Sequence, residues 1–124
     1  MIVSIGIDII EISRIQRLLE KGDRFKNRIY TDRERKYCDR KKNSALNYAA
    51  RFAAKEAFLK ALGTGLSLGV SFKEVEVVND EYGKPELNLY GKARALTEKK
   101  GGSHWHVSLS HLEGIAAAVV ILEK

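Results

Sequence analysis

Apolar and polar positions along the chain predict several short strands. Residues 2–8 are rich in β-branched side chains and predict a first strand. Alternating apolar and polar positions predict a strand at residues 72–78, and a turn leads from it to a shorter strand at residues 86–90. Residues 104–110 and 114–122 predict two strands joined by a short turn, as in a β-hairpin.

Helices are predicted between these strands. Ser13 and Thr31 each open a capping-box pattern, in which a hydroxyl and a glutamine or glutamate three residues later satisfy the first backbone amides. A third and longer helix is expected over residues 44–62, capped by Ser44. Its many alanines allow close packing against a neighbour. A last helix is expected over residues 92–100.

The order of these elements predicts an α+β fold, with a small and mostly antiparallel sheet packed with helices. The chain has 124 residues, enough for one hydrophobic core, so we expect a single domain over residues 1–124. The single cysteine, Cys38, excludes an intramolecular disulfide and a cysteine-based zinc cluster.

Membrane and export signals are weak in this sequence. The longest apolar run, residues 114–122, is much shorter than the ~18 residues that a membrane helix needs. The first residues lack the basic start of a signal peptide and reach an acid at Asp8. We therefore expect a cytoplasmic protein with no membrane partner.

The net charge of +6 is concentrated in one part of the chain. Residues 24–42 contain nine basic and three acidic side chains, whereas basic and acidic residues balance elsewhere. A local field of one sign attracts partners of the other sign, which here means a phosphorylated ligand, a nucleic acid or an acidic protein. A solvated helix face would give the same charge pattern.

Two segments carry acidic residues in positions that suit metal binding or catalysis. Asp8 ends an apolar strand in Gly6-Ile7-Asp8, where a carboxylate either serves a metal site or caps the next helix. Glu56 and Lys60 are spaced to share one helix face, either as a surface pair or as part of a site. If Glu56 faces Asp8, the two carboxylates can hold Mg²⁺ and Lys60 can meet a phosphate.

All three histidines lie in residues 104–111. In a strand His106 and Ser110 face one way and His111 the other, which disfavours a zinc site. No Gly-x-Ser-x-Gly elbow surrounds a serine, so a serine nucleophile is not indicated. In one interpretation, the histidines are ordinary strand residues whose hydrogen bonds are satisfied within the protein. Phosphate binding by hydroxyl, imidazole and turn amides is the other.

Taken together, three motifs resemble the 4′-phosphopantetheinyl transferases, in their short holo-[acyl-carrier-protein] synthase form. The motifs are Gly6-Ile7-Asp8, then Phe52-x-x-Lys55-Glu56-x-x-x-Lys60, and His106-Val-Ser-Leu-Ser-His111 near the C-terminus. The resemblance covers nearly the whole chain, and includes Arg51-Phe52-Ala-Ala-Lys-Glu-Ala-Phe, Gly63-Thr-Gly65, Ser71-Phe72 and Gly83-Lys84-Pro85.

The resemblance implies transfer of 4′-phosphopantetheine from coenzyme A to a serine of an apo acyl carrier protein, with release of adenosine 3′,5′-bisphosphate, in support of fatty acid biosynthesis. It implies that Asp8 and Glu56 hold Mg²⁺ and that Lys60 assists catalysis beside the pyrophosphate. Glu56, Asp8 or a metal-bound water could take the hydroxyl proton. Longer relatives carry a further acid at the place of Ile10, so only two protein carboxylates are expected here.

The resemblance also implies a homotrimer with sites at the subunit interfaces. Contacts to coenzyme A are implied for Lys60, Arg51, Gly65, His106, Ser110 and His111. Contacts to the acidic helix of the carrier protein are implied for Arg14, Arg24 and Arg28.

Two other classes of protein compete with this interpretation. A nucleic-acid-binding module would explain the basic charge, but the basic segment matches no known nucleic-acid motif and leaves Asp8, Glu56 and Lys60 unexplained. We therefore expect no nucleic-acid partner. An inactive scaffold of the same fold is disfavoured by the presence of the same three residues.

Overall fold

The computed structural model describes residues 1–124. Five strands, five α-helices and one short 3₁₀ helix follow one another along the chain. In order, they are β1 (Ile2–Glu11), α1 (Ile12–Glu20), α2 (Asp23–Ile29), α3 (Asp32–Asp39), α4 (Ser44–Leu62), η1 (Phe72–Glu74), β2 (Val75–Asn79), β3 (Pro85–Leu89), α5 (Gly91–Lys99), β4 (His104–Leu112) and β5 (Ile115–Glu123).

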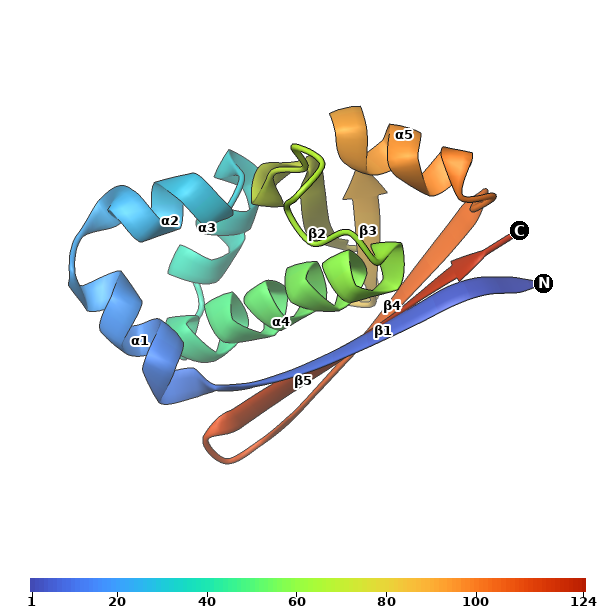
Figure 1. The fold of residues 1–124 in the computed structure, drawn as a ribbon. Helices are drawn as coiled ribbons and strands as arrows, with labels where there is room; N and C mark the ends of the chain where they lie inside the picture. Colours follow the sequence, from blue (N-terminus) through green and yellow to red (C-terminus); the bar gives the residue numbers. More distant parts are fainter.

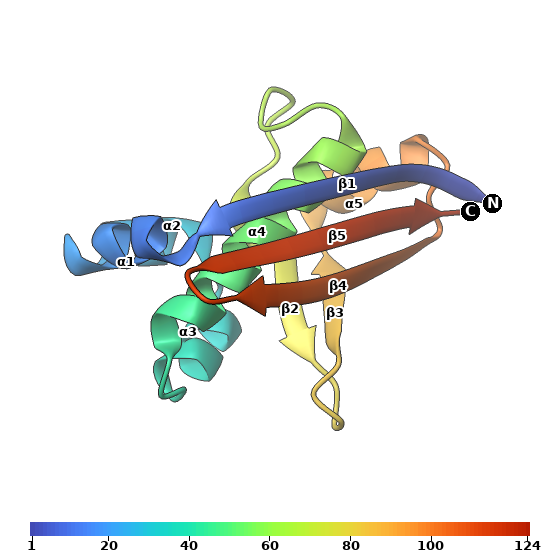
Figure 2. The same ribbon diagram turned by 90° about the horizontal axis from the view of Figure 1, so that it is seen from below.

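The strands form two antiparallel sheets, which confirms the predicted α+β class but divides the strands between two sheets rather than one. Strands β1, β5 and β4 lie side by side in that order, and β2 pairs only with β3. Helix α4 runs between the three-stranded sheet and a second layer that contains α2, α3 and the β2–β3 hairpin (Figure 1). The other face of the three-stranded sheet carries no helix (Figure 2).

Helix α4 is the centre of the core. Twelve of its nineteen residues are buried, and alanines make up much of its packing surface. Asn43 caps it by accepting a hydrogen bond from the Leu46 amide at 3.3 Å, so the predicted cap at Ser44 is wrong by one residue. Gly63 ends the helix at φ 84°, a backbone conformation that favours glycine. None of the helices has the length and apolar character needed to cross a bilayer.

Of the two predicted capping boxes, one is absent and one is present. Helix α1 begins at Ile12 with no side-chain cap, so the capping box expected at Ser13 is absent. The reason is that β1 continues to Glu11, which pairs with Ile115, and thereby leaves Ser13 inside the first helical turn. The capping box at Thr31 is confirmed, with its amide donating to Glu34 Oε1 at 2.9 Å and Oγ1 accepting from the Glu34 amide at 3.3 Å.

Strand β1 and helix α4 approach each other closely. A Cβ atom at Gly6 would lie 2.0 Å from the carbonyl oxygen of Ala57, so only glycine fits there. Two residues earlier, Ser4 Oγ donates to the carbonyl oxygen of Ala61 at 2.6 Å. The predicted close packing of the α4 alanines is thus confirmed, and the strand brings Asp8 against the same helix.

Candidate active site

Asp8 and Lys60 meet across the contact between β1 and α4. Lys60 Nζ donates to Asp8 Oδ1 at 2.9 Å and to the carbonyl oxygen of Ile7 at 3.0 Å. The lysine is exposed, whereas the Asp8 side chain is only 15% exposed. Two residues that are 52 positions apart in the sequence are therefore joined by an ion pair at the surface of one helix.

Glu56 lies one helical turn before Lys60 and is half-buried. Burial raises the pKa of its carboxyl group, and the negative charge of Asp8 raises that pKa further. The positive charges of Lys60 and Arg14 act in the opposite direction on the same pKa. Asp8 is thus near enough to Glu56 for its charge to act on the Glu56 carboxyl group.

The donors at this site suit a hard divalent cation. Two carboxylates offer oxygen ligands, and their mutual repulsion is relieved by a cation between them. Ile10, which follows Asp8 on the same side of the strand, is buried in the core and offers no oxygen. Mg²⁺ commonly takes only one or two protein carboxylates and completes its shell with water and substrate phosphate, so Asp8 and Glu56 fit such an ion.

A surface hollow of about 390 Å³ contains Glu56 and Lys60. Gly65, for which the family resemblance implied a contact to coenzyme A, belongs to its wall, and Phe72 also lines it. Gly65 has φ 56°, which favours a residue without a side chain. The hollow is large enough for the phosphate end of a ligand.

Arg51, Ser110 and His111 line a separate hollow of about 380 Å³. This second hollow shares no lining residue with the one that contains Glu56. Arg51 is 2% exposed; its Nη2 donates to Asn79 Oδ1 at 2.6 Å, and its guanidinium lies 4.1 Å from the centre of the Tyr37 ring. Its Nε is buried and has no hydrogen-bond partner in the protein.

His106 lies in neither hollow. The alternation predicted for its strand is confirmed, with Val107 buried and both Ser108 and Ser110 exposed. The exposed ring of His106 has Nε2 3.0 Å from Glu123 Oε1, and this hydrogen bond lowers the pKa of the Glu123 carboxyl group. Within one chain, then, the residues predicted to contact coenzyme A are divided among three places.

The three arginines predicted to meet a carrier protein lie together. Arg14, Arg24 and Arg28 line a groove of about 430 Å³ between α1 and α2. Five apolar side chains also line it, among them Phe25, Phe52 and Phe72, and Lys21 adds a fourth basic group. A groove lined by both apolar and basic side chains suits an acidic amphipathic helix.

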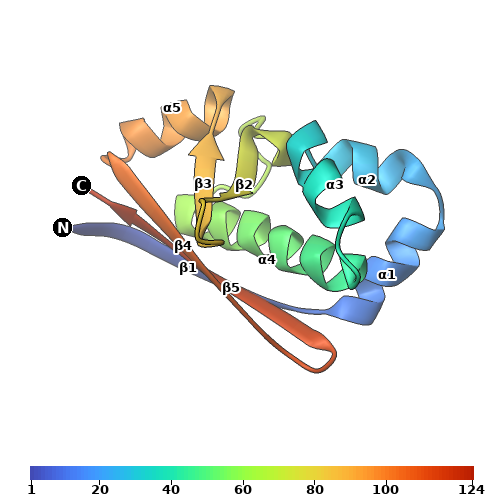
Figure 3. The same ribbon diagram turned by 180° about the vertical axis from the view of Figure 1, so that it is seen from behind.

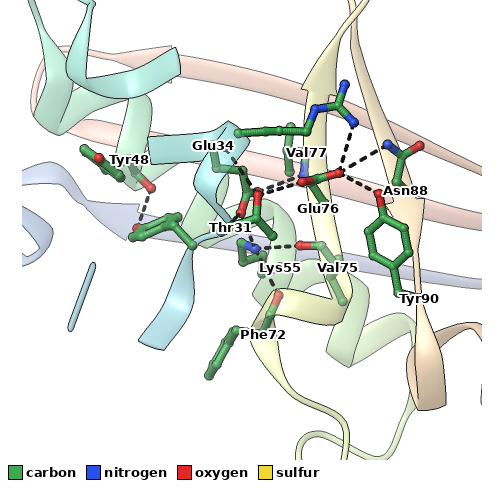
Figure 4. A network of polar contacts seen from close by, with 12 residues as sticks. Thr31, Glu34, Tyr48, Lys55, Phe72, Val75, Glu76, Val77, Asn88 and Tyr90 are labelled. Carbon is green, nitrogen blue, oxygen red and sulfur yellow. Dashed lines mark hydrogen bonds and ion pairs between the residues drawn. The ribbon is translucent and has the colours of Figure 1, made fainter. Parts of the chain in front are cut away.

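A buried ion pair was missed by the sequence analysis. The side chains of Lys55 and Glu34 are both fully buried, and Lys55 Nζ lies 2.8 Å from Glu34 Oε1 (Figure 4). The helical spacing contained a signal for it, because Lys55 falls on the same face as Arg51, Phe58 and Leu62, all of which are buried. A charged residue on such a face requires a buried partner.

Comparison with known proteins identifies the family of this chain. The model of the 4′-phosphopantetheinyl transferase superfamily matches residues 4–120, and the chain belongs to this superfamily. A holo-[acyl-carrier-protein] synthase of Geobacter sp. (strain M21) is 53% identical over 125 residues and matches the full length of both chains. Within the superfamily, the chain is therefore of the holo-[acyl-carrier-protein] synthase type.

Solved structures that are similar to this chain are also holo-[acyl-carrier-protein] synthases. The synthase of Neisseria meningitidis is 41% identical, with a TM-score of 0.89 and complete coverage of both chains. The synthase of Bacillus anthracis, solved in complex with CoA (3′,5′-ADP), is 42% identical with a TM-score of 0.81, and the match covers 98% of this chain and 96% of the other.

Proposed function

We propose that this protein transfers 4′-phosphopantetheine from coenzyme A to a serine of an apo acyl carrier protein and releases adenosine 3′,5′-bisphosphate. The observation that carries the proposal is the meeting of Asp8, Glu56 and Lys60 at the close approach of Gly6 to α4. Glu56 and Lys60 line one hollow, and Asp8 is bonded to that lysine. Two carboxylates and a lysine are the groups that a reaction at a pyrophosphate requires. The product would serve fatty acid biosynthesis in the cytoplasm.

In this reaction the serine oxygen bonds to the β-phosphorus, and the bond from that phosphorus to the bridging oxygen breaks. The leaving bisphosphate takes the electron pair of the broken bond. Lys60, whose ammonium is exposed at the hollow, would exchange its contact with Asp8 for the pyrophosphate oxygens. The serine proton would pass to a carboxylate oxygen of Glu56, the carboxylate that lines the hollow.

Mg²⁺ is the cation that we assign to this pair, held by Asp8 and Glu56. When bound, it would neutralise charge on the pyrophosphate and so favour attack by an uncharged hydroxyl. Asp8 is well suited to hold it because its backbone is fixed by the contact between Gly6 and Ala57. Arg51, with its unpaired Nε, is the side chain that we assign to the nucleotide 3′-phosphate.

We also propose that the protein is a homotrimer. The uncovered face of the three-stranded sheet exposes Ile5, Ile7 and Ile9, each at least 60% accessible. A contiguous apolar stripe of this kind is typical of a protein interface. Figure 3 shows that the tip of the β4–β5 hairpin projects beyond α4. A neighbouring copy could therefore bring its Ser110 and His111 to the hollow that contains Glu56.

Intact-mass spectrometry tests the proposed reaction directly. An apo acyl carrier protein is incubated with this protein, coenzyme A and Mg²⁺, with EDTA added to a matched sample. We expect the carrier protein to gain the mass of phosphopantetheine, and EDTA to abolish the gain. Absence of a mass gain with several carrier proteins, from a well-folded preparation, would contradict the proposal.

A further inference from the structure

The ammonium group of Lys55 is fully buried and uses all three of its N–H donors. Nζ donates to Glu34 Oε1 at 2.8 Å, to the carbonyl oxygen of Phe72 at 2.9 Å and to that of Val75 at 2.6 Å (Figure 4). Because a lysine ammonium has three donors, none remains for a substrate. Lys55 therefore cannot touch the reacting groups, although it is adjacent to Glu56 in the sequence.

The partner of Lys55 is equally well bonded. Glu34 Oε2 accepts from the Val77 amide at 2.8 Å, and Oε1 also accepts from the Thr31 amide at 2.9 Å. The pair thus joins α4 to the start of α3, to η1 and to β2. A buried ion pair is by itself a weak source of stability, because desolvation offsets the attraction. What the pair does provide is a fixed position for the elements that it joins.

Phe72 is the residue of most interest among these contacts. It is the one residue that lines both the hollow with Glu56 and Lys60 and the groove with the three arginines. Its ring lies 5.8 Å from the ring of Phe52 at an interplanar angle of 23°. In Figure 4 the carbonyl oxygen of Phe72 faces Lys55 and its ring points away. Lys55 therefore holds the backbone of a residue whose side chain separates the two sites.

We propose that Lys55 is a positioning residue that acts through Phe72. By fixing the η1 backbone, it sets the aromatic wall between the groove that docks the carrier protein and the hollow in which the serine reacts. This inference rests on the proposed function. A displacement of a positioned group by ~1 Å can cost ~10²-fold in rate, so a loosened wall is expected to impair use of the carrier protein. The Arg51 hollow, which Phe72 does not line, is expected to be unaffected.

A cycle of variants tests this inference. Lys55→Met alone would leave Glu34 as an unpaired buried charge, so it is combined with Glu34→Gln, which removes both charges together. We expect this paired variant to lose about tenfold in kcat/KM for the carrier protein, with KM for coenzyme A changed by less than about twofold. We expect Phe72→Ala to lower kcat/KM for the carrier protein by a similar factor.

The variant that carries all three substitutions separates positioning from general damage. If Lys55 acts through Phe72, adding Phe72→Ala to the paired variant causes no further loss of kcat/KM for the carrier protein. The total loss then stays at about tenfold. A multiplied loss of about a hundredfold would show independent effects and overturn the proposal. Wild-type kinetics in the paired variant would also overturn it. Urea unfolding of each variant shows whether the protein is folded at the assay temperature.

Two further results keep the test decisive. If the paired variant does not fold, Phe72→Ala with Lys55 intact still tests the wall, and unchanged kcat/KM for the carrier protein would overturn the proposal. The wild-type protein is assayed first in the same series. If it transfers no phosphopantetheine, the proposed function fails before any variant is compared, and the two failures are distinguished.

Discussion

Lys60 Nζ lies 2.9 Å from Asp8 Oδ1, so a lysine neutralises one of the two carboxylates that we assign to the metal. A divalent cation and the ammonium group would compete for the same oxygen in the free protein. A bound pyrophosphate would relieve this competition, because it offers Lys60 another negatively charged partner. The ion pair thus links binding of the cation to binding of coenzyme A.

Replacing Lys60 with methionine tests this competition. We expect Lys60→Met to bind Mn²⁺ several-fold more tightly in the absence of coenzyme A, since Asp8 loses its internal partner. Transfer is expected to fall by about 10²-fold, because a charge that stabilises the transition state is lost. Electron paramagnetic resonance of free Mn²⁺ measures the affinity. Lys99→Met, at an exposed position of α5, is the control. Unchanged Mn²⁺ affinity in Lys60→Met would contradict the competition.

Glu56→Gln keeps the shape of the side chain and removes its charge. We expect phosphopantetheine transfer to fall by at least about 10²-fold, with the thermal midpoint of unfolding unchanged or raised, because burial and Asp8 both disfavour the ionised carboxyl group. Glu11→Gln, at an exposed carboxylate of the same region, is the matched control and should stay active. Full activity of Glu56→Gln would remove this residue from the site.

Charge reversal in the basic groove is expected to separate the two substrates. Arg14→Glu combined with Arg28→Glu should raise KM for the carrier protein about tenfold or more. The change in KM for coenzyme A should be smaller, because the two arginines line the groove and not the hollow that contains Arg51. The wild-type KM for the carrier protein should rise with salt. Lys99→Glu reverses a charge elsewhere and should have no such effect. An equal loss for both substrates would argue against a docking role for the groove.

The carboxyl group of Glu76 predicts a pH dependence of stability. Burial alone would raise its pKa, but hydrogen bonds from Thr31, Tyr90 and Asn88 outweigh burial and lower it below the ordinary value of 4.5. Because the pKa of Glu76 is lower in the folded protein, its ionised carboxylate adds to the free energy of unfolding above pH 4.5. This contribution is lost as the pH falls through the lower, folded-state pKa. Figure 4 shows these partners around the carboxylate.

We therefore expect the free energy of unfolding of the wild type to fall more steeply with acid than that of Glu76→Gln. At neutral pH the variant should be less stable by about 2 kcal/mol, since hydrogen bonds to a charged group are lost. Urea unfolding between about pH 3 and 6 measures both curves. Glu81→Gln, in the exposed turn after β2, should follow the wild type. Parallel curves for Glu76→Gln and the wild type would contradict the assignment.

A charge on the uncovered sheet face should disrupt the proposed trimer. Ile7→Lys places an ammonium in the centre of the exposed isoleucine stripe, and the side chain is 66% accessible in one chain, so folding of the chain itself is not impaired. Light scattering after size-exclusion chromatography is expected to give a trimer for the wild type and a smaller species for the variant. Tyr82→Lys changes an apolar residue that is 88% exposed in a turn, and should remain trimeric. A monomeric wild type would contradict the trimer itself.

Local pattern predicted most of the helices and strands. The long α4 helix, the capping box at Thr31 and the C-terminal hairpin agree with the sequence because each depends on neighbouring residues. The errors lie where distant contacts override local preference. Strand β1 runs on to Glu11 because β5 pairs with it, and residues 72–74 form a 3₁₀ turn, whose first carbonyl oxygen is bonded by Lys55. Helix α2 was not predicted.

Local spacing was enough to predict which groups are available for chemistry: Asp8 on the first strand, and Glu56 and Lys60 on one face of a helix. Spacing within an element is enough for that, because a helix or strand fixes the relation of near neighbours. Three relationships could not be predicted in this way: Asp8 meets Lys60, Arg51 and Ser110 line a different hollow, and Lys55 is buried against Glu34. These contacts join residues far apart in the sequence, and they depend on packing, such as the fit of Gly6 against Ala57, that local patterns do not encode.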